Sequence, residues 1–167
     1  MSAHDLARAG ALVRLPPERA FELFTADIDR WWQRGRAWRA GRASVLHLEP
    51  FVGGRLFEAF DGEGDAGPRV ISTGEVLAWE PPHRLLLRWR GVNLGPDEAT
   101  EVEVRFEPRA SGTWVQVEHR GWSGVRPDHP VRHGQPPAAF LAGLGRWWGG
   151  LLTSLAARAG AAAPPST

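Results

Sequence analysis

The hydrophobic pattern of residues 136–158 is that of one long amphipathic helix. Its large apolar side chains recur at steps of three and four residues, which places them on one side of a 3.6-residue helix. These side chains are Phe140, Leu144, Trp147, Trp148, Leu151 and Leu155. The proline pair at 136–137 favours a helix start, and Gly160 predicts its end.

This helix needs a partner surface. Its glycines at 143, 145, 149 and 150 each cost about 1 kcal/mol relative to alanine. Burial of each large apolar side chain contributes about 1.5–3 kcal/mol, which outweighs that cost only if the helix docks. We therefore expect it to exist as a packed element.

The preceding residues alternate between apolar and polar positions, as strands do. The predicted strands are 8–15, 45–50, 55–60, 70–79, 84–90, 100–107 and 113–122. Between the first two, Phe21, Phe24 and Ile28 form the stripe of a short helix, and Trp31 and Trp32 follow on a second short helix or its exit loop. The order predicts an α+β domain with an antiparallel meander closed by the long helix.

Length and composition narrow the class of protein. The chain has 167 residues, and we expect one domain over 1–160 with a disordered tail at 161–167. Arg146 interrupts the best apolar run and the N-terminus lacks the apolar core of a signal peptide, so a cytoplasmic protein without a membrane span is expected. A net charge of +1 does not favour nucleic acid. The absence of Cys and Lys excludes thiol and Schiff-base chemistry.

Four sequence segments resemble those of a known protein family. They are LEPFVGGRLFE (48–58), GEVLAWEPPHRLLLRW (74–89), TEVEVRFEPRASGTWVQVEHRGW (100–122) and GRWWGGLL (145–152). From Ala11 to Ala159 the chain resembles the SRPBCC superfamily, and within it the branch related to the activator of the heat-shock-protein-90 ATPase.

The resemblance implies a helix-grip fold, similar to START domains and the birch-pollen allergen. In this fold a curved antiparallel sheet of about six or seven strands wraps around a long C-terminal helix, with two short helices after the first strand. Members bind lipids, polyketides, hormones or other hydrophobic molecules, and some are cyclases or hydrolases. Fold alone therefore does not decide the function.

The side chains expected between helix and sheet are mostly aromatic. The predicted ligand-binding set is Trp31, Trp32, Phe57, Glu58, Trp89, His119, Trp122, Phe140, Leu144, Trp147, Trp148 and Leu151. An aromatic wall with few polar anchors is typical of a small-molecule cavity. The same indoles also suit a solid core, and the pattern does not choose between the two.

Two polar residues are weak catalytic candidates. The alternation of 113–122 places His119 on the inner face of the sheet, where it is either a general base or a core histidine satisfied by a carboxylate. Glu58 faces inward if it shares the parity of Leu56, whereas the opposite choice puts Phe57 inside. No catalytic triad is visible.

Neither a metal nor a cofactor is predicted. His129 and His133 lie four residues apart beside Asp128, but Pro127 and Pro130 oppose the helix that would bring the imidazoles together. The sequence thus favours a non-catalytic binder of a hydrophobic or aromatic small molecule, as a monomer or homodimer.

A protein-binding, co-chaperone-like module is the first alternative, and a cyclase or hydrolase using His119 and Glu58 is the second. The stretch 30–42, with five Arg, three Trp and no acidic residue, is either a cationic rim for an anionic ligand or acidic partner, or a solvated loop. No separate N-terminal chaperone-binding domain is expected, which puts ATPase activation in doubt.

Overall fold

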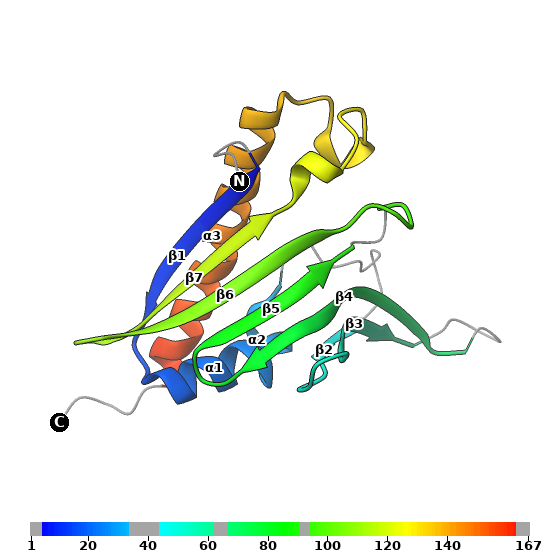
Figure 1. Cartoon of the computed structure of the whole chain (residues 1–167). Coiled ribbons are helices and arrows are strands. Elements are labelled where there is room, and N and C mark those ends of the chain that lie inside the picture. The colour runs from blue at the N-terminus through cyan, green and yellow to red at the C-terminus, as the bar shows by residue number, and fades with distance from the viewer. Residues whose placement is uncertain (1–4, 34–43, 62–66, 91–93, 163–167) are drawn as a thin grey trace.

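The computed structural model describes residues 5–33, 44–61, 67–90 and 94–162, arranged as seven strands and three α-helices with two short 3₁₀ turns (Figure 1). The strands are β1 (Leu6–Val13), β2 (Ser44–Leu48), β3 (Arg55–Phe60), β4 (Arg69–Glu80), β5 (Arg84–Trp89), β6 (Thr100–Arg109) and β7 (Gly112–Arg120). The helices are α1 (Pro17–Thr25), α2 (Ile28–Trp31), η1 (Trp122–Gly124), η2 (Pro130–Arg132) and α3 (Pro137–Ala162).

All strands form one antiparallel sheet in the order β1-β7-β6-β5-β4-β3-β2. Each predicted strand is confirmed, as are the two short helices after the first strand and the 45–50/55–60 hairpin. The expected end of the long helix at Gly160 is wrong, since α3 continues to Ala162. The alanines around that glycine are strong helix formers, and one glycine costs only about 1 kcal/mol.

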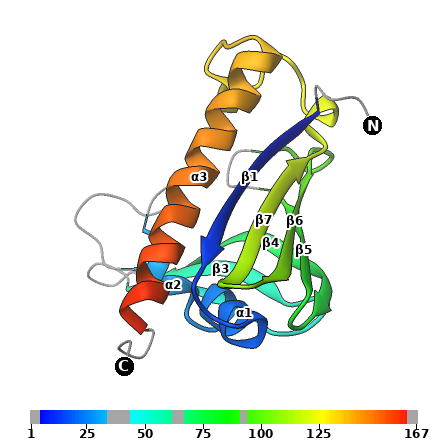
Figure 2. The same cartoon turned by 90° about the vertical axis from the view of Figure 1, so that its left-hand side faces the viewer.

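The long helix lies along β1 on the inner face of a curled sheet, and α1 and α2 close one end (Figure 2). Three alanines of β1 (Ala7, Ala9 and Ala11) pack in the core clusters on the helix side. A Cβ at Gly145 would lie 3.4 Å from the carbonyl oxygen of Arg8. Small residues on both elements therefore let the helix backbone approach the strand closely.

Two irregularities bend the sheet around the helix. The β3–β4 ladder shifts register between Leu56 and Phe57, and the β4–β5 ladder shifts between Val76 and Ala78. A bulge increases the local twist and bends the strand. The β2–β3–β4 end of the sheet consequently curls away from the β1–β7–β6 end, giving a half-barrel.

A side chain from α2 contacts the free edge of the sheet at β2. The backbone N–H of Leu46 donates a hydrogen bond to Oδ1 of Asp29 at 2.8 Å. An unpaired edge strand is a template for pairing with another chain, and occupying its donors blocks that pairing. The Asp29 carboxylate thus occupies one backbone donor of this edge.

The face of the sheet turned away from α3 carries a buried carboxylate. Glu103 is only 4% exposed because Arg84, Arg105 and Arg120 approach its oxygens at 2.5, 3.2 and 3.3 Å. Burial raises the pKa of Glu103, but hydrogen bonds from Arg84 and Arg120 outweigh it and hold the pKa below its ordinary value.

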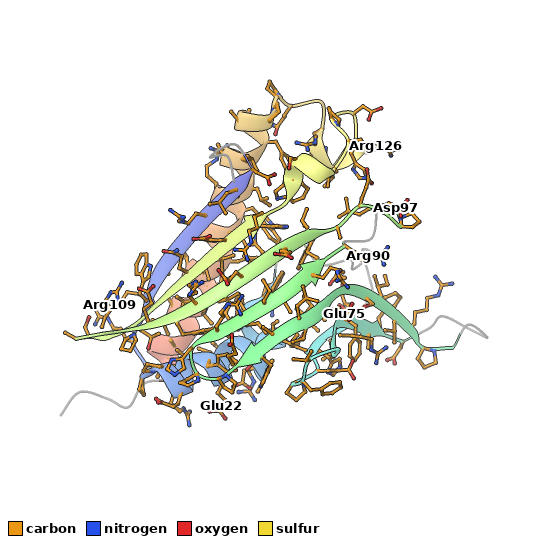
Figure 3. All side chains as sticks on the ribbon, viewed as in Figure 1. Glu22, Glu75, Arg90, Asp97, Arg109 and Arg126 are labelled. Carbon is orange, nitrogen blue, oxygen red and sulfur yellow. The ribbon has the colours of Figure 1, made fainter. Side chains whose placement is uncertain are left out.

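Ion pairs continue to the end of this face. Arg109 lies at the tip of the β6–β7 hairpin (Figure 3). Its guanidinium contacts the carboxylate of Glu107 at 2.8 Å. Both partners are about half exposed, so solvent screens the pair. Glu103 and Glu107 of β6 therefore make a matched comparison of a shielded and a solvated ion pair.

We predict that Glu103→Gln lowers the free energy of unfolding by about 2 kcal/mol at pH 7. Breaking a fully buried ion pair costs about 3–5 kcal/mol. The cost here is smaller because the three arginine side chains stay 18–51% exposed. Denaturant unfolding of both proteins measures it. The control Glu107→Gln should stay within about 0.5 kcal/mol of the wild type, and equal effects at the two sites would contradict a shielded network.

Candidate functional site

The space between α3 and the sheet is occupied by a continuous layer of aromatic rings, which we call the aromatic layer. Its members are Trp31, Trp32, Trp89, His119, Trp122, Phe140, Trp147 and Trp148. Trp32 is central, because it lies parallel to Trp89 at 5.9 Å and edge-on to Trp148 at 5.3 Å. The layer joins α2, β5, β7, η1 and α3.

Among the described residues, two rings of the aromatic layer, Trp89 and Trp147, are only half-buried. Trp89, Trp147 and Leu144 are half-buried and pack against the core, whereas Trp32, Trp122 and Trp148 are at most 4% exposed. Trp89 comes from the end of β5, and the other two half-buried residues come from the middle of α3. We call these three half-buried residues of β5 and α3 the seam, because they are where solvent touches the edge of the aromatic layer.

A directed chain of hydrogen bonds crosses this layer at His119. The indole N–H of Trp148 donates to Nδ1 of His119 at 3.2 Å. Nε2 of His119 lies 2.7 Å from Oγ1 of Thr100, whose hydroxyl donates to the carbonyl oxygen of Trp89 at 3.3 Å. An indole N–H can only donate, so Nδ1 is the acceptor and Nε2 carries the proton.

The chain holds His119 in one neutral tautomer. Burial, at 1% exposure, lowers the pKa of His119 to about 3. Both ring nitrogens are already used, so neither presents a free lone pair to a substrate. The partners are a hydroxyl and an indole, not the carboxylate expected for a satisfied core histidine.

Glu58 faces the same interior but lies far from His119. The side chain is 1% exposed and accepts a hydrogen bond from Oγ of Ser44 at 2.5 Å. Four strand spacings of about 4.8 Å separate β3 from β7, or ~19 Å along the sheet. The structure does not bring the predicted polar pair together.

The inward position of Glu58 leaves Phe57 on the opposite face. There the ring of Phe57 stacks on His47 at 5.0 Å and lies under the guanidinium of Arg55 at 4.5 Å. Inclusion of Phe57 in the ligand-binding set is thus corrected by strand parity. Leu151 is buried in the core below the aromatic layer.

Two residues of this site were not expected from the sequence. Thr100 completes the chain at His119, and its inward parity with Val102 and Val104 was the available signal. Arg132 is 5% exposed and donates to the carbonyl oxygens of Trp122 and Val125 at 2.7 and 2.9 Å. A buried arginine in a proline-rich loop has no periodic signal in the sequence.

The residues considered for metal do not converge in the part of the chain described. His129 is buried, accepts at Nδ1 from the Val131 N–H and lies 3.5 Å from Glu98, whereas Asp128 is largely exposed beside Arg126. No cluster of three metal-ligating side chains occurs among the described residues. Most of the arginine-rich stretch, 34–42, lies outside them.

We predict that His119 makes stability fall in mild acid. Its folded pKa of about 3 lies below the unfolded value of about 6.5, so between these values only the unfolded chain binds the proton. The contribution of neutral His119 to the free energy of unfolding is complete above pH 6.5. It is lost by up to about 1.4 kcal/mol per pH unit as pH falls toward 3. Relative to wild type, His119→Gln should lose less stability between pH 6 and 4 in denaturant titrations.

The matched control is His47→Gln, at an exposed position on β2. It should leave the pH dependence of unfolding unchanged, because its side chain lies on the exposed face of β2 and takes no part in the buried hydrogen-bond chain at His119. Parallel pH profiles for wild type and His119→Gln would mean that the buried ring is protonated in the native state.

The sequence of this chain matches a known protein family. The family model described as Activator of Hsp90 ATPase homolog 1-like protein matches residues 14–157. No curated protein matches the sequence. Among the described helices, none has both the length and the apolar character needed to cross a bilayer.

Solved structures share the fold at low identity. A protein of Nitrosomonas europaea has a TM-score of 0.63 at 13% identity, over 98% of this chain and 99% of its own. A protein of Mesorhizobium loti has a TM-score of 0.58 at 22% identity, over 90% of this chain and 93% of its own. The AHSA1-like protein of Aeromonas hydrophila has a TM-score of 0.57 at 21% identity, over 94% of this chain and 93% of its own. The chain belongs to the Activator of Hsp90 ATPase homolog 1-like protein family, within the SRPBCC superfamily, and has its helix-grip fold.

Proposed function

We propose that this protein binds a hydrophobic or aromatic small molecule between α3 and the sheet, without catalysing a reaction. The observation that carries the proposal is the half-buried seam of Trp89, Trp147 and Leu144, continuous with the buried indoles behind it. Indole faces offer a large apolar contact area and specific ring geometry to an aromatic ligand.

The polar groups near the seam support binding without chemistry. His119 is neutral and saturated, so it cannot take a proton from a ligand without breaking its bond to Trp148. General acid–base catalysis needs a group within hydrogen-bond reach and a pKa near the working pH. His119 meets neither condition, and Glu58 lies several strands away.

A second candidate is a protein-binding module, which the description of the matching family suggests. On the sheet face turned away from α3, Val45, Ala59 and Val70 are cross-strand neighbours in one row. Val45 is 47% exposed and Val70 is 52% exposed. An apolar row open to solvent is typical of a protein-interaction surface.

We predict that hydrophobic aromatic molecules quench the tryptophan fluorescence of the protein. A panel of fatty acids, flavonoids and aromatic polyketides identifies the class. For a compound that binds, Trp147→Ala should weaken the affinity about ten-fold, because it removes a wall of the seam. The control Trp114→Ala changes an indole on the opposite face and should leave the affinity unchanged. No quenching by any member would count against the proposal.

The second candidate makes a separate prediction. Purified heat-shock protein 90 should be retained on the immobilised chain, and Val45→Asp combined with Val70→Asp should abolish retention by placing charges in the apolar row. Val52→Asp is the control, since this residue is 65% exposed in the turn between β2 and β3. Retention that survives the double change would assign the contact to another surface.

A further inference from the structure

One buried donor next to the seam has no partner. Nε1 of Trp122 is enclosed, with its residue 4% exposed, and no hydrogen-bond acceptor in the described part of the chain reaches it. More than nine in ten buried polar groups in proteins are hydrogen-bonded, and leaving one unpaired costs about 1–3 kcal/mol. Such a donor calls for an acceptor that the described residues do not supply.

The indole of Trp122 is held in place and cannot turn to find one. Its ring packs against His119 on one side and Phe140 on another, both at 4.8 Å between ring centres. Its backbone carbonyl accepts a hydrogen bond from the buried Arg132 guanidinium at 2.7 Å, which lies 5.4 Å from the Phe140 ring. The donor direction is therefore fixed before any ligand arrives.

The position of Trp122 links it to the seam. Leu144 packs against both hydrophobic clusters of the protein, the main one containing Trp148 and the smaller one containing Trp122. Leu144 is itself half-buried at the surface. Leu144 is therefore the residue through which the seam adjoins the cluster that contains Trp122.

Other buried polar groups in and beside the aromatic layer are occupied. The N–H groups of Trp31 and Trp148 donate to backbone carbonyls and to His119, respectively. The hydroxyl of Thr100 both contacts His119 and donates to a backbone carbonyl. Trp122 is thus a spare neutral donor in an apolar wall. A neutral acceptor suits it, since one uncharged N–H cannot compensate for burying an anion.

We propose that the ligand is an aromatic molecule bearing a neutral carbonyl oxygen, and that Nε1 of Trp122 donates a hydrogen bond to that oxygen. This inference rests on the proposed function and specifies the chemistry of its ligand. The rings of the ligand lie along the seam, and its carbonyl points inward to Trp122. Trp122 is then the residue that distinguishes an aromatic ketone from an aromatic hydrocarbon of the same shape.

The test uses two probes of nearly identical shape, 2-acetylnaphthalene and 2-isopropenylnaphthalene, which differ in a carbonyl oxygen against a methylene group. Each is titrated into ¹⁵N-labelled full-length wild type, Trp122→Phe and Trp147→Phe, following the indole N–H resonances. The Trp122 resonance is assigned by its loss in Trp122→Phe. Affinities are compared between variants for one probe at a time, because water solvates the ketone better than the alkene.

The expected result is that the ketone moves the Trp122 indole proton downfield and the alkene does not. Trp122→Phe should weaken ketone binding about ten-fold, by leaving its oxygen unpaired, and leave alkene binding unchanged. Trp147→Phe should weaken both probes alike, since it alters only the apolar wall. Retained resonances of the remaining indoles confirm that each variant is folded.

Two outcomes would overturn the inference and are distinguishable. In the first outcome, both probes shift the Trp89 and Trp147 resonances, but Trp122→Phe binds the ketone as tightly as the wild type does. The site then binds aromatic molecules, but Trp122 does not recognise their carbonyl oxygen, and the partner of its N–H group is water. If neither probe shifts any indole resonance, the proposed function fails for this ligand class together with the inference.

Discussion

The structure depends on the burial of one face of α3 against the curled sheet. The helix carries four glycines within eight residues, and its large side chains contribute their burial energy only when docked. Contact differs along its length: alanines of β1 and Gly145 permit close backbone approach, while Trp147 and Trp148 meet indoles from α2 and β5. The aromatic layer is thus the wider part of the same interface.

Within that layer, polar atoms restrict how the rings can be arranged. His119 links an indole of α3 to Thr100 of β6 and onward to the backbone of β5, so one hydrogen-bond chain ties helix to sheet. In a low-dielectric interior a saturated chain of this kind rigidifies its surroundings, whereas an unsaturated group is costly. Trp148 and Trp122 illustrate the two cases, since one indole N–H is bonded to His119 and the other has no acceptor in the described chain.

The two faces of the sheet have different chemistry. The inner face is apolar and aromatic, and the opposite face is joined by ion pairs that converge on Glu103. The ion pairs give way to exposed valines toward β2, where Asp29 occupies one backbone donor of the strand edge. Small-molecule binding and protein binding would therefore use separate surfaces, and one does not exclude the other.

The period of the hydrophobic pattern by itself determined all seven strands, the helices α1 and α3 and the inward parity of His119, because side-chain direction repeats every 2 or 3.6 residues. The resemblance of particular sequence segments to a known family predicted the family of the chain, which the family model confirms. Only tertiary structure decided that Glu58 is remote from His119, that Glu103 is shielded by three arginines, and that no acceptor among the described residues reaches the indole N–H of Trp122. These facts depend on which strands become neighbours and on the reach of individual side chains, and local periodicity carries no information about either.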